Sequence, residues 1–277
     1  MTKSFLTQNQ QVDLLIARGL SINNREIAIQ KLQSINYYRF NTYFHQFLKD
    51  NTFIPGTTFD NILSAYEKDT ILRRTILKHL EEIEVKTRCQ LSHELGRRYG
   101  PLAFYECSNF SNASVWAELQ ESFNKEISRD KKDPIAEHYY ANHDGQFEVW
   151  VIVEYLSFGD LSRLFSISNN EIQNVVAKSF NVHETLLKGW LQSLSILRNI
   201  CAHYGYLRKR EFSIAPAIPR SLIQQVGSNR QLFSLLIALS WLIDKNQQME
   251  LVEVLRTMEN DWSYYGFIDN WENVLLS

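Results

Sequence analysis

Three polar residues near the end of one predicted helix have types and spacing suited to acid–base and phosphate chemistry. Arg198, Asn199 and His203 lie in the run RNICAH, with four residues between the Arg and the His. Histidine exchanges protons near neutral pH, and arginine presents a planar fork of donors to phosphate oxygens. An imidazole that takes the proton from a ribose 2′-hydroxyl, with a guanidinium on the phosphate, could cleave RNA without a metal ion.

The Arg-x4-His spacing is weakly specific by itself, and the Asn makes it more specific. The same spacing occurs at Arg74/His79 and Arg88/His93, but of these three arginines only Arg198 is followed by Asn. A glycine-rich phosphate loop, a His-Glu-x-x-His zinc motif and a Gly-x-Ser-x-Gly elbow are absent from the sequence. The alternative interpretation is a structural Arg at the core edge and an ordinary exposed His at a helix end.

The helix that must position the motif is predicted over residues 182–203. Asn181 and Glu184 have nearly the spacing of a capping box, and Gly205 is a fitting stop signal. At about 100° per residue, the apolar side chains of this helix form one stripe, made of Leu187, Trp190, Leu191, Leu194, Leu197 and Cys201.

The motif residues lie at different angles around this predicted helix. Arg198 is at the edge of the apolar stripe, whereas Asn199 and His203 share the opposite side. Arg198 and His203 are separated by about 140° around the axis, so one straight helix cannot easily bring both onto one phosphate. Two chains related by a twofold axis could do so, each contributing an Arg, an Asn and a His to a shared cleft.

The composition predicts a helical protein of a reducing compartment. The chain has 277 residues but only 10 Gly and 5 Pro, too few turn residues for a many-stranded β-sandwich. Its formal net charge of −2 gives no argument from bulk charge for binding nucleic acid or anionic membranes. The three cysteines form no Cys-x-x-Cys pair, the N-terminus has no apolar leader, and the apolar run at residues 232–243 is too short for a bilayer. We therefore expect a cytoplasmic protein without metal, cofactor or membrane association.

The N-terminal part is predicted to contain two short helices and an aromatic core segment. The helices, over residues 12–18 and 24–35, have the outline of a helix-turn-helix. Because no basic cluster accompanies them, we interpret them as packing helices. The aromatic run at residues 35–47 is interpreted as core, with RNA stacking as the alternative.

Two further helices have informative patterns. The longest is predicted from Thr58 to about Arg98, and its mixed charges indicate a solvated face whose residues pair with one another. A strongly apolar helix is predicted over residues 147–165, with an interruption at Gly159.

Around the motif, the sequence resembles a known family. The run LRNICAHYGYLRKR (residues 197–210) resembles the Arg-Asn-x-x-x-His signature of HEPN-superfamily ribonucleases, specifically of the bacterial abortive-infection (Abi-like) proteins. Three other blocks follow the family pattern in the same order, and they are INYYRF, LEEIEVKTRCQLSHEL through YGP, and EYLSFGDLSRLF. The resemblance covers about residues 5–215.

This resemblance implies an all-α fold, a HEPN-type helical bundle with additional N- and C-terminal helices. We divide the chain into an N-terminal helical segment (residues 1–55), a HEPN core with the motif (56–215) and C-terminal helices completing the same globular unit (216–277). The family also implies a homodimer, or a higher oligomer, that cleaves RNA as a metal-independent endoribonuclease without a cofactor.

The resemblance also assigns roles to the motif. By that analogy His203 is the acid or base, Arg198 holds the phosphate, and Asn199 orients either one. One branch of HEPN toxins has a Tyr two residues after the His, which a partner enzyme modifies. Gly205 occupies that position here, so control by such a modification is not expected.

The segment that follows the motif is a candidate RNA-binding surface. It contains a basic run flanked by aromatic residues, namely Tyr204, Tyr206, Arg208, Lys209 and Arg210. Such side chains could contact an RNA backbone. The alternative is a solvated loop.

The function expected from the resemblance is that of a toxin-like enzyme in phage defence by abortive infection. Its partners would be an RNA substrate, a second copy of the chain, and an antitoxin or a structured non-coding RNA. The alternative is a non-catalytic HEPN module that binds RNA or a protein partner and keeps the motif as a structural relic. A weaker alternative is a DNA-binding regulator that uses residues 12–35.

Overall fold

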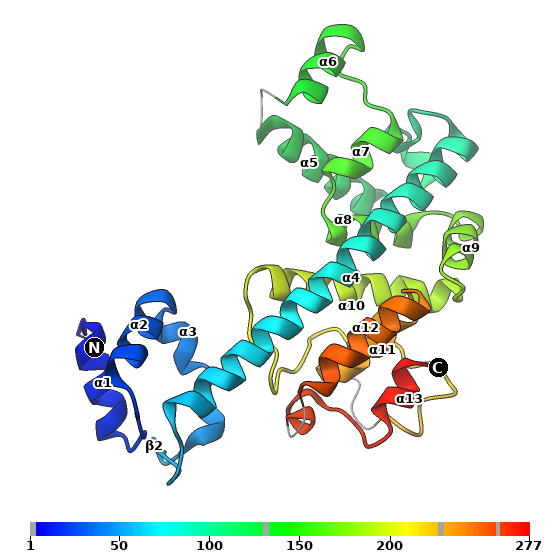
Figure 1. Ribbon diagram of the computed structural model, residues 1–277. Coiled ribbons are helices and arrows are strands. Elements are labelled where there is room, and N and C mark those ends of the chain that lie inside the picture. Colours follow the sequence, from blue (N-terminus) through cyan, green and yellow to red (C-terminus); the bar gives the residue numbers. More distant parts are fainter. Residues whose placement is uncertain (1–3, 130–132, 227–229, 259–260) are drawn as a thin grey trace. The chain divides into compact units, whose positions relative to one another are not determined.

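The chain folds mainly into α-helices (Figure 1). The computed structural model describes residues 4–129, 133–226, 230–258 and 261–277. Within these ranges the one sheet is a two-stranded antiparallel hairpin of β1 (Leu48–Lys49) and β2 (Thr52–Phe53). The predicted all-α fold class is therefore confirmed.

The chain divides into two compact units, Met1–Leu72 and Arg73–Ser277, called unit 1 and unit 2 below. Unit 1 begins with α1 (Gln8–Ala17) and α2 (Arg25–Ser34), which pack against each other. The side chain of Asn24 accepts the N–H of Ile27 and caps α2 at the predicted position. The short helices α3 (Tyr37–Asn41) and η1 (His45–Phe47) then lead into the hairpin.

The aromatic run in and after α3 contributes to the core of unit 1, as predicted. Phe40, Tyr43 and Phe44 are buried, and the rings of Phe40 and Phe44 meet edge to face with centroids 5.4 Å apart. The hydroxyl of Tyr43 donates to the buried carboxylate of Asp69 at 2.8 Å. The polar end of this buried ring therefore has the hydrogen-bond partner that burial requires.

The longest helix of the described chain is α4 (Phe59–Tyr99), the long cyan ribbon of Figure 1. Thr58 caps its first turn as predicted, because its hydroxyl accepts the N–H of Asn61. Gly100 follows its last residue with a positive φ, which glycine adopts readily at a helix end. Residues 59–72 of α4 belong to unit 1, and residues 73–99 belong to unit 2.

The charged side of α4 in unit 2 is only partly solvated. A pair along the helix is present as expected, between Glu84 and Arg88. However, Arg73 and Glu84 are buried, so the prediction of a solvated face is wrong at these two positions. Parts of unit 2 that are distant in sequence cover them; for example, Arg73 donates to the carbonyl of Gly205.

Unit 2 is organised around α10 (Glu184–Ala202). This helix packs against α8 (Phe158–Ile167), α9 (Asn170–Ser179) and α11 (Leu232–Ser240), and α11 is buried along its whole length. No helix in the described ranges is both long and apolar enough to span a bilayer. The remaining elements of unit 2 are η2 (Ala103–Tyr105), η3 (Cys107–Asn109), α5 (Ala113–Arg129), α6 (Pro134–Asn142), α7 (Val149–Tyr155), α12 (Lys245–Arg256), η4 (Trp262–Tyr265) and α13 (Trp271–Leu275).

The apolar segment at residues 147–165 is two helices, and the break precedes Gly159. α7 ends at Tyr155, and the hydroxyl of Ser157 caps α8 by accepting the N–H of Asp160. The predicted interruption at Gly159 is therefore misplaced. The boundary between the two helices is set by the capping serine, which lies two residues before the glycine.

One histidine of α4 is buried in unit 2 without hydrogen bonds. His79 is fully buried, and neither ring nitrogen has a partner among the described residues. Burial lowers the pKa of His79 below its ordinary value of 6.5; the charges of Glu250, Glu82 and Asp244 oppose this shift, and Lys78 adds to it. The folded chain therefore favours the neutral imidazole at this position.

We expect His79 to make the protein less stable as the pH falls from about 7 to about 5. Because the pKa of His79 is lower in the folded chain, the unfolded chain binds a proton below about pH 6.5 that the folded chain does not, and this uptake favours unfolding. His79→Leu should weaken this pH dependence. It should also raise the free energy of unfolding near neutral pH by about 1–3 kcal/mol, because it removes unsatisfied buried polar atoms.

Urea unfolding at a series of pH values measures both effects. His93→Leu is the matched control, because His93 lies on the same helix with its side chain 70% exposed. In the control, the free energy of unfolding should change with pH as steeply as in the parent protein. The same steepness in His79→Leu would contradict the prediction.

Candidate active site

The rotation of α10 is fixed by its apolar stripe. All six predicted side chains are buried, namely Leu187, Trp190, Leu191, Leu194, Leu197 and Cys201. Ser193 and Ser195, which lie between members of the stripe, are also buried, whereas Asn199 and His203 on the other side of the helix are exposed. The start of the helix differs from the prediction, because His183 caps it in place of Asn181. Asn181 adopts a positive φ of 57° in the turn after α9.

The outward side of α10 presents the three motif residues. The side chain of Arg198 is 39% exposed, and Asn199 and His203 are exposed. Arg198 Nη1 donates to Asn199 Oδ1 at 3.3 Å. Among the described residues, no hydrogen bond or ion pair joins Arg198 to His203. Within one chain the Arg is therefore hydrogen-bonded to the Asn but not to the His, which agrees with the angle between their positions.

A carboxylate from α4 contacts Arg198. Glu84 Oε2 lies 3.5 Å from Arg198 Nε, while Glu84 Oε1 lies 2.5 Å from Arg88 Nη2. The side chains of Glu84 and Arg88 are only 10% and 12% exposed, and Arg88 also donates to the carbonyl of Val153. Because one carboxylate is shared by two guanidinium groups, these three side chains together carry one excess positive charge, and the exposed Glu81 lines the same cavity.

An open cavity of about 420 Å³ lies beside this cluster. It is lined by residues of α4 and α10, namely Leu77, Glu81, Glu84, Val85, Arg88, Arg198 and Ala202. A guanidinium has five N–H donors, and Arg198 directs Nε toward Glu84 and Nη1 toward Asn199. The remaining donors of Arg198 could bind the oxygens of a phosphate group.

The backbone at the end of α10 follows the Schellman pattern. His203 is the C-cap, and the N–H groups of Tyr204 and Gly205 donate to the carbonyls of Cys201 and Ile200 at 3.1 and 2.7 Å. Tyr204 supplies the left-handed residue, with φ of 58°. A Cβ at Gly205 would lie 2.6 Å from Ile200 Cγ2, so a larger residue would force a rearrangement. Gly205 therefore allows close packing just after the left-handed turn.

The predicted RNA contact at Arg208 is not supported by its position. Arg208 is buried, its Nη2 lies 2.7 Å from Asp261 Oδ1, and its guanidinium stacks 3.6 Å from the centroid of Tyr264. A buried, paired guanidinium cannot reach an RNA backbone without breaking these contacts. We therefore interpret Arg208 as a structural residue.

The other predicted RNA-binding residues remain accessible to different degrees. Tyr204 and Lys209 are exposed, whereas Tyr206 and Arg210 are half-buried. Arg210 Nε donates to the carbonyl of Tyr206, which closes a local turn. Tyr204 and Lys209 are the two members of this segment best placed for a solvent-borne ligand.

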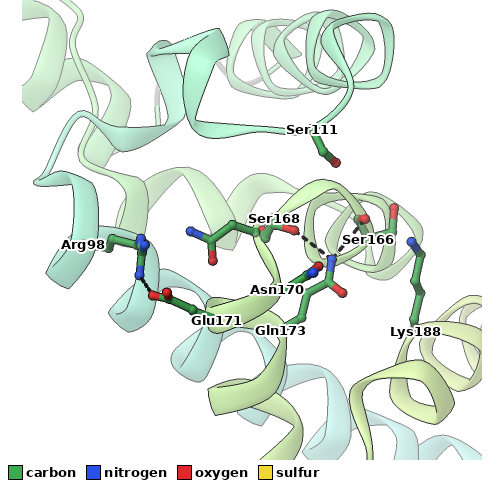
Figure 2. A pocket seen from close by; sticks show the side chains of 9 residues that line it. Arg98, Ser111, Ser166, Ser168, Asn170, Glu171, Gln173 and Lys188 are labelled. Atoms are coloured by element: carbon green, nitrogen blue, oxygen red, sulfur yellow. Dashed lines mark hydrogen bonds and ion pairs between the residues drawn. The ribbon is translucent and has the colours of Figure 1, made fainter.

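A second pocket, of about 470 Å³, lies near the start of α9 (Figure 2). Figure 2 shows Gln173 donating to the carbonyls of Ser166 and Ser168, and Arg98 paired with Glu171. No histidine, cysteine or motif residue is among the residues that line this pocket. The pocket therefore lacks the side chain types best suited to acid–base catalysis, and we place the candidate active site at the motif.

Comparison with known proteins assigns the chain to a family. Residues 30–208 match the family described as Abi-like protein, and this match covers well over half of the chain. The chain belongs to the Abi-like protein family. No curated protein and no solved structure shows significant similarity to it. The matched region of this Abi-like protein includes α10 and all three motif residues.

Glu84 and Arg88 were not identified as site residues from the sequence of this Abi-like protein. Both lie in the block LEEIEVKTRCQLSHEL, and their spacing of four residues is that of a helix pair. That spacing predicts their mutual ion pair, which is present. It could not reveal the contact with Arg198, because that contact depends on how α4 and α10 pack.

We expect the two ends of this charge cluster to differ strongly in their effect on stability. Glu84→Ala should lower the free energy of unfolding by about 3–5 kcal/mol, because it leaves Arg88 buried without its carboxylate. Arg198→Ala should cost at most about 1 kcal/mol, because Arg198 is more exposed and Glu84 keeps Arg88. Denaturant unfolding measures both changes.

Glu81→Ala is the control for this comparison, because Glu81 is an exposed residue of α4 that lines the same cavity. It should have little effect on unfolding. Equal losses in Glu84→Ala and Arg198→Ala would show that Arg198 is as necessary to the fold as Glu84.

Proposed function

We propose that this Abi-like protein is a metal-independent endoribonuclease of the HEPN superfamily. The observation that carries the proposal is the outward placement of Arg198, Asn199 and His203 on a helix whose opposite face is fully packed. Side chains so placed are not needed to fill the core. Their types are those that phosphate binding and acid–base catalysis require.

The proposed reaction transfers the phosphate within the RNA strand. A His203 imidazole takes the proton of the ribose 2′-hydroxyl, and the 2′-oxygen forms a bond to phosphorus while the bond from phosphorus to the 5′-oxygen breaks. A protonated His203 gives a proton to the leaving 5′-oxygen. The free N–H groups of Arg198 would bind the non-bridging oxygens as negative charge develops on them. The products are a 2′,3′-cyclic phosphate and a 5′-hydroxyl.

This chemistry needs a second chain in the proposed mechanism. Within one chain no hydrogen bond or ion pair joins His203 to Arg198, and their positions lie about 140° apart around the axis of α10. A twofold axis beside α10 would place the motif residues of two chains in one cleft. A homodimer is therefore the smallest assembly that we propose as active, and higher oligomers could contain several such pairs.

The biological role that fits the family is phage defence by abortive infection. A ribonuclease that cleaves cellular RNA must be held inactive until infection, so we propose control by an antitoxin protein or a structured non-coding RNA. Such a partner could act by covering the cavity beside Arg198 or by preventing dimer formation. Both routes would act on the same exposed side of α10.

We expect the purified protein to cleave RNA in the presence of EDTA. His203→Ala should reduce the rate by about 10²- to 10⁴-fold, the usual contribution of an acid–base group. Arg198→Ala should also reduce it, because the developing phosphate charge loses its cation. Labelled RNA resolved on a denaturing gel gives the rates, and end-group analysis should detect 2′,3′-cyclic phosphates.

The control for this experiment is His183→Ala, which removes an exposed histidine at the opposite end of α10. It should cleave RNA at the rate of the parent protein. Cleavage that persists in His203→Ala would show that another group, or a contaminating nuclease, performs the reaction.

The separation of Arg198 from His203 within one chain also fits a second function, that of a non-catalytic module that binds RNA or a protein partner. In that case Arg198 would contribute to binding and His203 would have no chemical role. RNA binding without cleavage, unchanged in His203→Ala, would support this alternative.

Mixing two impaired variants tests the shared cleft directly. Arg198→Ala and His203→Ala chains should each cleave RNA much more slowly than the parent protein, and mixing them should restore part of the activity. Random assembly of an equimolar mixture makes about half of the dimers mixed, and each mixed dimer holds one intact Arg198 and one intact His203. Full activity in a chain shown to be monomeric by light scattering would rule out the shared cleft.

A further inference from the structure

One aromatic residue of the run at residues 35–47 is not part of the core. Tyr38 on α3 is 83% exposed, although Phe40, Tyr43 and Phe44 of the same run are buried. An exposed tyrosine ring does not stabilise the fold by burial, and its flat apolar face is available to a ligand. The packing of unit 1 therefore explains the neighbours of Tyr38 but not Tyr38 itself.

A pocket of about 440 Å³ lies beside this ring, entirely within unit 1. The lining residues that matter for recognition are Arg18, Tyr37, Tyr38, Asn41 and Asn51, with Leu14 adding an apolar wall. The pocket thus combines aromatic faces with amide and guanidinium groups. Its volume is large enough for a single nucleobase with part of its sugar.

The guanidinium of Arg18 is held in a defined orientation at this pocket. Arg18 Nε donates to the carbonyl of Asn51 at 3.0 Å, and Nη2 donates to Asn51 Oδ1 at 2.7 Å. Its Cζ lies 5.4 Å from the ring centroid of Phe53. Because an arginine carries five N–H donors, these contacts leave others for a ligand. Such preorganisation reduces the entropy lost on binding.

The turn between β1 and β2 supports this orientation. Asp50 and Asn51 both adopt positive φ, at 50° and 63°, as the tight hairpin connection requires. The turn thereby directs both the carbonyl and the side-chain oxygen of Asn51 toward Arg18. The position of this guanidinium thus depends on backbone geometry that is fixed before any ligand arrives.

Unpaired RNA bases are recognised by this combination of groups. Proteins stack such bases on aromatic rings and read their edges with hydrogen bonds from amides and guanidinium groups. We propose that the pocket of unit 1 binds one unpaired base of an RNA strand, with Tyr38 stacking on the base and Arg18 and Asn41 hydrogen-bonding to its edge. The inference rests on the proposed function in its choice of RNA as ligand, but the site lies outside the catalytic motif.

Binding can be tested with the full-length chain in a His203→Ala background, so that the RNA stays intact. The probe is a fluorescently labelled, unstructured RNA hexamer, and fluorescence anisotropy gives its dissociation constant. Tyr38→Ala should weaken binding by about 5- to 150-fold, the usual loss when one stacking aromatic is removed. Tyr38→Phe should retain binding because it keeps the ring.

Tyr140→Ala is the matched control, since Tyr140 is a 59% exposed tyrosine of unit 2. It should bind the hexamer like the parent chain. A salt titration distinguishes stacking from phosphate contact: Tyr38→Ala should lower the affinity without changing the slope against salt concentration. Equal affinities for Tyr38→Ala, Tyr38→Phe and Tyr140→Ala would overturn the inference.

The experiment also separates this inference from the proposed function. If RNA binding depends on Tyr38 but the parent protein does not cleave RNA, the base-binding site is supported and the proposed ribonuclease activity is contradicted. If the parent protein cleaves RNA but binding does not depend on Tyr38, the activity is supported and the base-binding site is contradicted.

Discussion

Burial of the apolar stripe of α10 is the constraint on which the candidate site depends. Each fully buried leucine or tryptophan of the stripe stabilises the fold by about 1.5–3 kcal/mol or more relative to exposure. A rotation of α10 by one residue would expose several of these side chains and bury Asn199 or His203 without partners. The free energy lost in exposing apolar side chains and burying polar ones would far exceed anything that the polar side chains of α10 could gain by the rotation. The direction in which Arg198 and Asn199 point is therefore set by residues that take no part in the chemistry.

Glu84 forms unequal ion pairs with its two arginine partners, Arg88 and Arg198. Its contact with Arg88 is shorter than its contact with Arg198, and Arg88 is also the more buried of the two. Arg88 thus satisfies most of the need for a counter-charge to the buried carboxylate. In the proposed reaction, Arg198 could therefore turn toward the RNA phosphate without leaving Glu84 unpaired. The cluster keeps a guanidinium oriented at the surface while the fold does not depend on it.

Local signals in the sequence were sufficient for the framework and insufficient for the charge cluster. Hydrophobic spacing gave the stripe of α10, and capping residues gave the starts of α2 and α4, because each depends on neighbours within one or two turns. The buried state of Glu84 and Arg208 depends on contacts with Arg198 and Asp261, which lie far along the chain. Periodicity tells which side of a helix is polar, but not whether another element covers that side. For the same reason, the sequence did not reveal that Arg208, in the basic run after the motif, is buried against Asp261.

The second contribution of α4 is at the end of the motif helix. Arg73 of α4 donates to the carbonyl of Gly205, and the Schellman hydrogen bonds fix the backbone on either side of Tyr204. The backbone of His203 is thus held, while its side chain stays exposed and forms no hydrogen bond or ion pair with Arg198. Catalysis requires reacting groups to be placed within a fraction of an ångström, and an exposed imidazole alone does not meet that requirement. In the proposed dimer the second chain would supply the missing restraint, so that cleavage would depend on assembly.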